Sequence, residues 1–310
     1  MAAVQEHIHY ALPSVADSPS EIERCAAFLR SSQALFSLLS TRLTRLLTRI
    51  PRLDMMHIAI RGYMHGRLSF APLEEMDAPP QRILELGCGS GAWAIQAAEE
   101  LPAAHVVAVD LSPFPDRPVP SNFEFIQLDI TKELPFNPHS FDIVHSRFVF
   151  GHVAKPRETL ARIASLVAPR GFLLLEDFDS ESLLWTSPPA AARFTELYVA
   201  MYREHDQEPD IGRNLKQIME NLDGFGSPAH EHKAAVPLGV QLDDYNDAMR
   251  AFARGMRNTD IHAAGLLIAR QGGNYGFTDD VLEAYLSAVN TADYAAIFDV
   301  YFCWARRTAL

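Results

Sequence analysis

Hydrophobic positions in the first part of the chain recur with the period of a helix. Between residues 18 and 66, apolar residues return at three- and four-residue spacing, which is typical of amphipathic helices. Ser18 and Ser20 stand where a helix N-cap is expected, and Pro51 is expected to separate two helices. We therefore predict an N-terminal helical cap over residues 17–78, preceded by a flexible stretch at 1–16.

After residue 78 the pattern changes to short apolar runs that alternate with helical stretches. Such alternation is typical of βαβ units and of a parallel sheet covered by helices. Pro115, Pro118 and Pro120 predict a loop in place of a full helix between the second and third strands. The expected strands are 82–87, 105–112, 123–130, 140–148 and 171–178, and the expected helices are 92–101 and 157–167.

The last third of the chain is mainly helical but contains two further strand-like runs, at 231–239 and 299–307. We therefore predict an α/β fold with a Rossmann-like seven-stranded sheet, formed by residues 79–240 together with 298–310. The N-terminal helices precede this sheet, and a helical lid at 241–297 is inserted before the last strand. An insertion at this point lies above one edge of the sheet and can close a pocket.

Charge and cysteine content exclude some classes of function. The 310 residues carry a net charge of −12, which disfavours binding to a phosphate backbone, so no nucleic-acid partner is expected. The three cysteines lie far apart without the spacing of zinc ligands, so no metal site is expected and a reducing, cytoplasmic location fits best. No secretory signal and no membrane span are expected either.

The stretch RILELGCGSGAWAIQ, residues 82–96, places three glycines between the first strand and a helix. Glycines at a strand end allow a ligand to approach the backbone, and the helix offers free N–H groups there. The spacing leaves two ligands open. Gly87, Gly89 and Ala92 satisfy the G-x-G-x-x-A pattern for dinucleotides, whereas Gly87, Gly89 and Gly91 satisfy the loop that binds S-adenosylmethionine (SAM).

Acidic residues near three successive strand ends favour SAM. Glu85 precedes the first glycine, where a carboxylate suits an ammonium and a sulfonium better than a pyrophosphate. Asp110 follows about 20 residues later, where an acid binds both ribose hydroxyls, and Asp129 ends the third strand, where it can accept from the adenine amine. Each acid alone also has a structural explanation, as a surface acid or as the cap of the next turn.

These motifs resemble those of class I SAM-dependent methyltransferases, and more narrowly those of the fungal LaeA/UMTA-like group. The resemblance covers roughly residues 50–240 together with the closing strand at 299–307. One departure is Arg170, which replaces a glycine of the usual KPGG turn. The segments that carry the resemblance are RLDMMH (52–57), LELGCGSGAWAI (84–95), VDLSPFPDRPVPSNFEFIQLDI (109–130) and FDIVHSRFVFGHV (141–153).

The resemblance implies SAM as cofactor and S-adenosylhomocysteine (SAH) as product. It assigns the glycine loop to the methionine half and the end of the second strand to the ribose. The end of the third strand is assigned to the adenine and the end of the fourth to the sulfonium and methionine. The helix before the first strand is expected to cover the cofactor. The residues so implied are Glu85, Gly87, Cys88, Gly89, Gly91, Asp110, Leu111, Asp129, Ile130, Ser146, Arg147, Arg52 and His57.

Methyl transfer is an in-line displacement that needs proximity and orientation, and a base only where the acceptor must lose a proton. His152 follows the fourth strand and titrates near neutrality, so it is the candidate base, although a structural role is also open. Candidate walls for an apolar acceptor, each also explained by helical packing, are Phe150, Trp185, Tyr198 and Tyr202.

The sequence thus predicts a methyltransferase acting at oxygen, nitrogen or carbon of a small fungal secondary metabolite, as a monomer or homodimer. A SAM-binding cyclase or pericyclase has the same sequence pattern, because fold does not determine function. A LaeA-like regulatory protein is the third hypothesis, and a dinucleotide-dependent oxidoreductase is the fourth.

Overall fold

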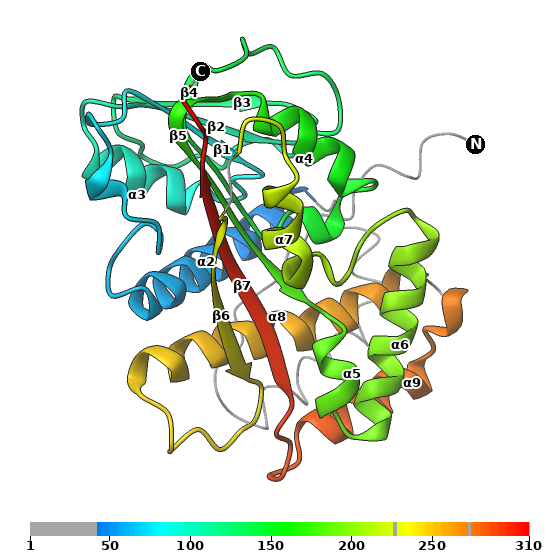
Figure 1. Cartoon of the computed structure of the whole chain (residues 1–310). Helices are drawn as coiled ribbons and strands as arrows, with labels where there is room; N and C mark the ends of the chain where they lie inside the picture. The colour runs from blue at the N-terminus through cyan, green and yellow to red at the C-terminus, as the bar shows by residue number, and fades with distance from the viewer. Residues whose placement is uncertain (1–41, 226–227, 272–273, 310) are drawn as a thin grey trace.

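The computed structural model describes residues 42–225, 228–271 and 274–309 (Figure 1). The predicted flexible stretch at 1–16 and the helical residues 18–41 lie outside these ranges. Within them, seven strands form one sheet in the order β3-β2-β1-β4-β5-β7-β6. The strands are β1 Arg82–Leu86, β2 His105–Asp110, β3 Phe123–Gln127, β4 Phe141–Arg147, β5 Val167–Asp179, β6 His230–Pro237 and β7 Ile297–Arg306.

Strands β1 to β5 are parallel, whereas β7 runs antiparallel to both of its neighbours, β5 and β6. The strand order reverses direction at β1, because β2 and β3 lie on one side of it and β4 and β5 on the other. This confirms the predicted Rossmann-like, seven-stranded α/β fold. A ligand site is expected where the order reverses, at the carboxyl ends of β1 and β4.

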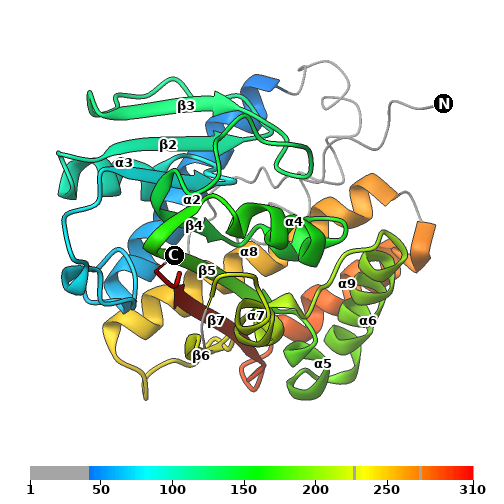
Figure 2. The ribbon, with the colours of Figure 1, turned by 45° about the horizontal axis from the view of Figure 1, so that its top comes forward.

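Helices cover both faces of the sheet (Figures 1 and 2). One face packs against α4 and α7, and the other against α3, with α2 and α8 continuing this layer toward β6 and β7. The helices are α2 Arg42–Tyr63, α3 Ala92–Glu100, α4 Pro156–Ala164, α5 Ser182–Thr186, α6 Pro189–Glu204, α7 Ile211–Glu220, α8 Asp247–Gln271 and α9 Asp279–Val289, with short 3-10 turns at Leu73–Glu75, Phe150–His152 and Asn274–Gly276.

Burial on both faces explains the continuous apolar runs of the strands. In β1, Ile83 packs in the core beside α3, while Leu84 packs in the core beside α4 and α7. In β2, Val106 packs in the core beside α3 and Val107 packs in the core beside α4 and α7. Successive side chains of a strand point to opposite faces, so a strand that is covered on both faces has apolar residues at most of its positions.

A further core lies beyond the sheet's centre, where α2, α6, α8 and α9 pack around the ends of β5 and β7. Its buried members include Met56, Phe194, Phe252, Tyr285 and Phe298. Helices α8 and α9 stand between β6 and β7 in the chain, as predicted for the inserted helical segment. Helix α8 packs against α2 and α9 packs against α6, so the insertion is anchored to the rest of the fold.

The predicted helix break at Pro51 is wrong, because α2 continues from Arg42 to Tyr63. Proline removes one N–H donor from a helix and disturbs one turn, and tertiary packing can outweigh that loss. Here the packing of α2 against α8 supplies such support. The predicted proline-rich loop is confirmed, since residues 111–122 contain no helix.

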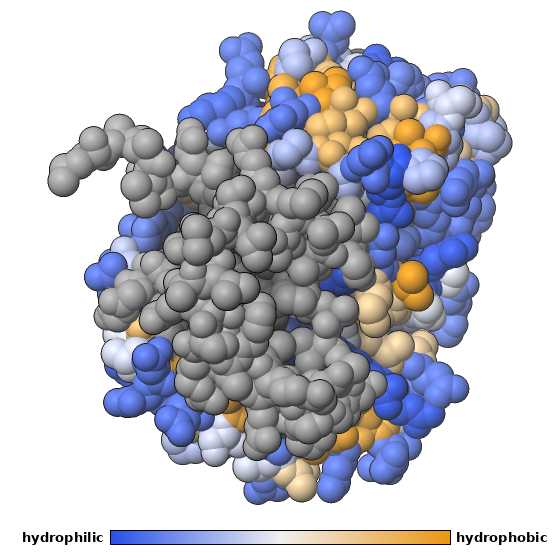
Figure 3. Space-filling view, turned by 180° about the vertical axis from the view of Figure 1, so that it is seen from behind, coloured by the Kyte–Doolittle hydropathy of each residue, from blue (hydrophilic) through white to orange (hydrophobic). Residues whose placement is uncertain are grey.

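In the described part of the chain, no helix combines the length and the apolar character needed to cross a membrane. Hydrophobic residues on the coloured part of the rear face occur in small groups among hydrophilic ones (Figure 3).

Candidate active site

A cavity opens at the carboxyl ends of the parallel strands, at the point where the strand order reverses. The glycine loop after β1 and the end of β2 line one part of it. Helices α2, α6 and α8 line the remainder together with residues at the ends of β4, β5 and β7 and on α5. Of the residues predicted for the site, those that line the cavity are Arg52, His57, Glu85, Gly87, Cys88, Gly89, Asp110, Arg147, His152 and Tyr198.

The glycine loop requires glycine for both conformational and steric reasons. Gly87 and Gly91 have φ of 66° and 77°, in the left-handed region. A Cβ atom on Gly87 would lie 2.4 Å from Val149 Cγ2, and one on Gly91 would lie 2.5 Å from Phe114 Cε2. The loop therefore presents bare backbone between strand and helix, although Gly91 itself does not line the cavity.

Glu85 holds the start of the helix that follows the loop. Its buried carboxylate accepts a hydrogen bond from Ala94 N, 3.1 Å away, and so satisfies one of the free N–H groups of α3. The other oxygen, Oε1, lies 3.7 Å from His145 Nδ1. Burial raises the pKa of Glu85, while His145 and Arg147 act in the opposite direction. Its direct role toward a cofactor stays a prediction.

Asp110 joins the glycine loop to the end of β2. Its Oδ2 accepts from Gly89 N at 2.8 Å, and its Oδ1 accepts from Ser112 N at 2.8 Å. The carboxylate is thereby held rigidly at the cavity wall. Two backbone donors thus fix the orientation of Asp110 at the cavity wall.

The two residues predicted for the adenine, and Leu111 predicted for the ribose, do not line the cavity. Asp129 Oδ1 accepts from Thr131 N and Oγ1, at 2.9 and 2.6 Å, so this carboxylate caps its own turn. Ile130 is buried in the core beside α4 and α7, and the Leu111 carbonyl accepts from Gln127. Contact of Leu111, Asp129 and Ile130 with a cofactor stays a prediction.

Under the cavity runs a chain of buried charged and imidazole groups. His145 is fully buried and lies between Glu85 and Glu176, with its Nε2 3.6 Å from Glu176 Oε1. Trp93 stacks on its ring with a centroid distance of 3.7 Å. Glu176 accepts a hydrogen bond from Arg147 Nε, which extends the chain to the end of β4. Three adjacent strands thus contribute one ionic network.

Arg147 controls the ionisation of its two neighbours. Burial alone would raise the pKa of Glu176, but Arg147 and His145 outweigh it and lower the pKa to about 2. Burial, with Arg147 second, lowers the pKa of His57 to about 3, so its imidazole is neutral and accepts from Arg147 Nη1 at 3.2 Å. The third nitrogen, Nη2, is buried and has no hydrogen-bond partner among the described residues. It is therefore placed to bind an anionic ligand group.

Ser146, predicted beneath the sulfonium, is not part of the cavity wall. It is buried, and its hydroxyl donates to the Leu86 carbonyl at 3.3 Å. Successive residues of β4 point to opposite faces of the sheet, so only Arg147 of this pair reaches the cavity. Contact of Ser146 with a cofactor stays a prediction.

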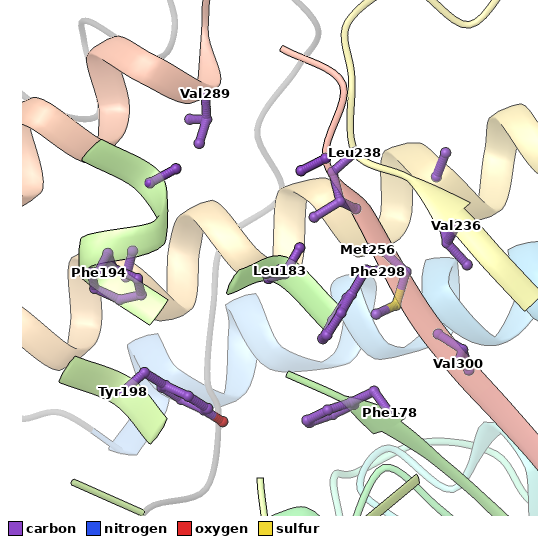
Figure 4. Close-up of a cluster of buried hydrophobic side chains, with 14 of the residues drawn as sticks. Phe178, Leu183, Phe194, Tyr198, Val236, Leu238, Met256, Val289, Phe298 and Val300 are labelled. Carbon is purple, nitrogen blue, oxygen red and sulfur yellow. The ribbon is translucent and has the colours of Figure 1, made fainter. Parts of the chain in front are cut away.

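The other part of the cavity is apolar. Phe178, Leu183, Phe194, Tyr198, Met256 and Phe298 all line it, and Figure 4 shows the Tyr198 hydroxyl directed toward Phe178. His152 stands in the same lining, and its Nδ1 lies 2.9 Å from the Tyr202 hydroxyl. The buried Asp177 carboxylate accepts from Phe150 N and Gly151 N and thus positions the turn that carries His152.

Three residues predicted as acceptor walls do not line the cavity. Phe150 is buried in the core beside α4 and α7, and Tyr202 lies behind His152 with no exposed surface. Trp185 is 67 % exposed on α5, where the guanidinium of Arg213 lies over its ring. The sequence shows that such residues are aromatic, but the direction of each side chain depends on the tertiary packing.

Some residues of the site were not anticipated. Arg117 donates to Asp54 of α2 and to the Ser90 carbonyl, and so ties the proline-rich loop to the glycine loop. Asp260 of α8 also lines the cavity. An acid among the apolar residues of a helix face could have identified Asp260 as a candidate site residue from the sequence. Nothing in the sequence indicates a role for Arg117. Within the described residues, no group of three or more His, Cys, Asp or Glu side chains is arranged to hold a metal ion.

The fold and cavity define an α/β protein whose ligand site lies at the switch point of the sheet. A family model described as a methyltransferase domain matches residues 55–223, more than half of the chain. The chain therefore belongs to this methyltransferase family, which confirms the predicted class.

Individual relatives agree with this assignment. The chain is 39% identical to methyltransferase str3 of Strobilurus tenacellus, over 69% of this chain and 76% of that protein. It is 33% identical to methyltransferase str2 of the same fungus, over 82% of this chain and 90% of that protein. It is 26% identical to the secondary metabolism regulator laeA of Aspergillus fumigatus, over 63% of this chain and 52% of that protein. These relatives confirm the predicted resemblance to the fungal group.

Proposed function

We propose that this protein transfers a methyl group from SAM to a small, largely apolar acceptor in fungal secondary metabolism. The observation that carries the proposal is that one cavity is continuous from the glycine loop and Asp110 to its apolar part. This apolar part, lined by Phe178, Leu183, Phe194, Tyr198, Met256 and Phe298 together with His152, is called the chamber below. Membership of the methyltransferase family and the relatives named methyltransferase in Strobilurus tenacellus support it.

The residues present fit SAM. Arg147 Nη2, buried and without a described partner, suits the carboxylate of the methionine half. Asp110 suits the ribose hydroxyls, and Gly87 and Gly89 of the glycine loop line the cavity together with it. Arg52 and His57 of α2 cover this end of the cavity.

When bound, SAM supplies a methyl carbon that forms a bond to the acceptor's lone pair as the carbon–sulfur electron pair returns to sulfur, leaving SAH. The chain's own contribution is to bind and orient the acceptor and to exclude water with apolar walls. His152 receives the proton of an acceptor hydroxyl, and the Tyr202 hydroxyl at its Nδ1 fixes the orientation of the ring.

The first test is binding of SAH by calorimetry. We expect binding by the wild-type protein and a loss of at least tenfold in affinity for Asp110→Ala, with no change for the exposed neighbour Asp116→Ala. A wild-type protein that does not bind SAH contradicts the proposal.

The second test separates methyl transfer from cyclisation and from regulation. SAM with a labelled methyl group is incubated with the protein and a panel of small phenols, enols, amines and carboxylic acids. Labelled acceptor formed together with an equal amount of SAH supports the proposal. An isomerised acceptor without SAH indicates the cyclase instead, and SAH binding without turnover of any acceptor indicates a regulatory role.

A further inference from the structure

Helix α8 presents one face to the cavity, and an acid stands in the middle of that face. Met256, Thr259, Asp260 and Ala263 all line the cavity, at the three- and four-residue spacing of one helical face. Met256 and the neighbouring Phe194 and Phe298 make this part of the wall apolar. A carboxylate in such surroundings is costly unless it is hydrogen-bonded.

Tyr285 of α9 supplies part of that hydrogen bonding. Its hydroxyl donates to Asp260 Oδ2 at 2.6 Å, and Tyr285 is itself buried. Burial raises the pKa of Asp260 to about 6, although the hydrogen bond from Tyr285 and the nearby Arg257 act in the opposite direction. The carboxylate is therefore mainly ionised at pH 7.5, and a carboxylate accepts more than the single hydrogen bond that Tyr285 donates.

We propose that Asp260 is the acceptor-binding residue of the chamber, and that it selects acceptors carrying a second hydrogen-bond donor besides the group that is methylated. This inference rests on the proposed methyltransferase function and names the class of substrate. The acceptor is an apolar scaffold with two polar groups. One is held by His152, and the other, a hydroxyl or an ammonium, donates to Asp260.

Tyr285 provides the means to separate this role from a structural one. If Asp260 served only to tie α8 to α9, the contact with Tyr285 would be its whole purpose. Asp260→Asn keeps an oxygen acceptor for Tyr285 but removes the charge, whereas Tyr285→Phe removes the tie and keeps the carboxylate. If Asp260 binds the acceptor, Asp260→Asn weakens acceptor binding and Tyr285→Phe does not. If Asp260 is structural, Tyr285→Phe lowers the stability of the protein as much as Asp260→Asn does.

The experiment measures binding of three probes to the SAH-bound protein by ligand-observed NMR titration. 3-Methylphenol carries one donor group, resorcinol carries two hydroxyls, and 3-hydroxybenzylamine carries a hydroxyl and an ammonium. We expect resorcinol or 3-hydroxybenzylamine to bind about tenfold more tightly than 3-methylphenol, the gain expected of one hydrogen bond to a charged group. The tighter of the two identifies the donor.

Asp260→Asn is expected to abolish this preference while SAH affinity and the thermal midpoint stay unchanged, and Tyr285→Phe is expected to retain it. Equal binding of all three probes by the wild-type protein, or an unchanged preference in Asp260→Asn, overturns the inference. Absence of SAH binding in the wild-type protein is a different result, because it contradicts the proposed function itself. A fall in midpoint for both variants with no change in preference assigns Asp260 a structural role.

Discussion

Arg147 and Glu176 form a buried ion pair at the ends of the neighbouring strands β4 and β5, with Arg147 Nε donating to the Glu176 carboxylate. The side chains are only 9% and 3% exposed. The pair also orients the remaining nitrogens of Arg147, one toward His57 and one without a described partner beside the cavity. A buried pair of this kind links the stability of the fold to the geometry of the site.

Removal of the Glu176 charge is expected to destabilise the protein. Glu176→Gln leaves Arg147 buried without its counter-ion, and breaking a buried pair costs about 3 to 5 kcal/mol. The exposed Glu196, which pairs with Arg193 three residues earlier on α6, is the control, and its change to Gln is expected to cost less than about 1 kcal/mol. Urea denaturation measures both. Equal effects of the two variants would contradict the assigned role of Glu176.

The same ion pair predicts a dependence of stability on pH. The pKa of Glu176 is lowered from 4.5 to about 2 in the folded protein, so its stabilising contribution is fully present above pH 4.5 and is lost as the pH falls toward 2. The difference corresponds to about 3 kcal/mol. We expect the free energy of unfolding of the wild type to converge on that of Glu176→Gln over this window. A constant difference between the two from pH 6 to pH 2 would exclude this linkage.

Replacement of Arg147 by lysine is expected to weaken SAH binding by about tenfold or more. Lysine keeps the positive charge but cannot bind Glu176, His57 and a ligand carboxylate with one planar group. Calorimetry with SAH gives the dissociation constant, and Arg193→Lys on the exposed face of α6 serves as the control. If Arg147→Lys binds SAH as tightly as the wild type, the carboxylate is held elsewhere.

Two glycine substitutions are expected to change the stability of the protein in opposite directions. Gly87→Ala places a Cβ atom 2.4 Å from Val149 at a φ of 66°, and we expect a loss of about 2 to 4 kcal/mol together with weaker SAH binding. Gly62→Ala adds a methyl group to α2 with no atom within 4 Å, and we expect a gain of up to about 1 kcal/mol. Thermal unfolding measures both. A neutral Gly87→Ala would show that the loop tolerates a side chain.

Replacement of His152 is expected to affect turnover and spare cofactor binding. His152→Gln removes the proton acceptor, so kcat toward a hydroxyl acceptor is expected to fall by about 10²- to 10⁴-fold while SAH affinity is unchanged. Tyr202→Phe removes only the partner of His152 Nδ1 and is expected to have a smaller effect. An unchanged kcat in His152→Gln would assign the histidine a structural role.

Several elements were predictable because their signals are local. The strands from Arg82 and His105 are covered on both faces and contain almost no polar interruptions, so their apolar runs stand out. The loop with Pro115, Pro118 and Pro120 was predictable because prolines remove backbone donors. The same reasoning failed at Pro51, where packing of α2 against α8 maintains the helix. Local propensity decides an element only where no stronger tertiary contact acts on it.

The candidate site was predictable in its backbone and less so in its side chains. The positions of Gly87, Asp110 and Arg147 follow from strand ends that meet at one edge of a parallel sheet, and all three line the cavity. Phe150 and Tyr202 do not line the cavity, because a side chain near the site can point into the core behind it. Asp260 was missed because it lies on α8, 81 residues beyond the end of β5 at Asp179, and only the tertiary packing brings it to the cavity.

The sequence by itself determined the succession of strands and helices along the chain. It also determined the glycine loop after the first strand and the acidic residue at the end of the second strand. These features depend on the periodicity of apolar residues and on the conformational freedom of glycine, which act over a few neighbouring residues. Only the tertiary structure decided which charges share a buried network and which residues face the cavity. Glu85, His145 and Glu176 become neighbours because three strands lie side by side, and burial then makes the ionisation of the two carboxyl groups depend on their surroundings.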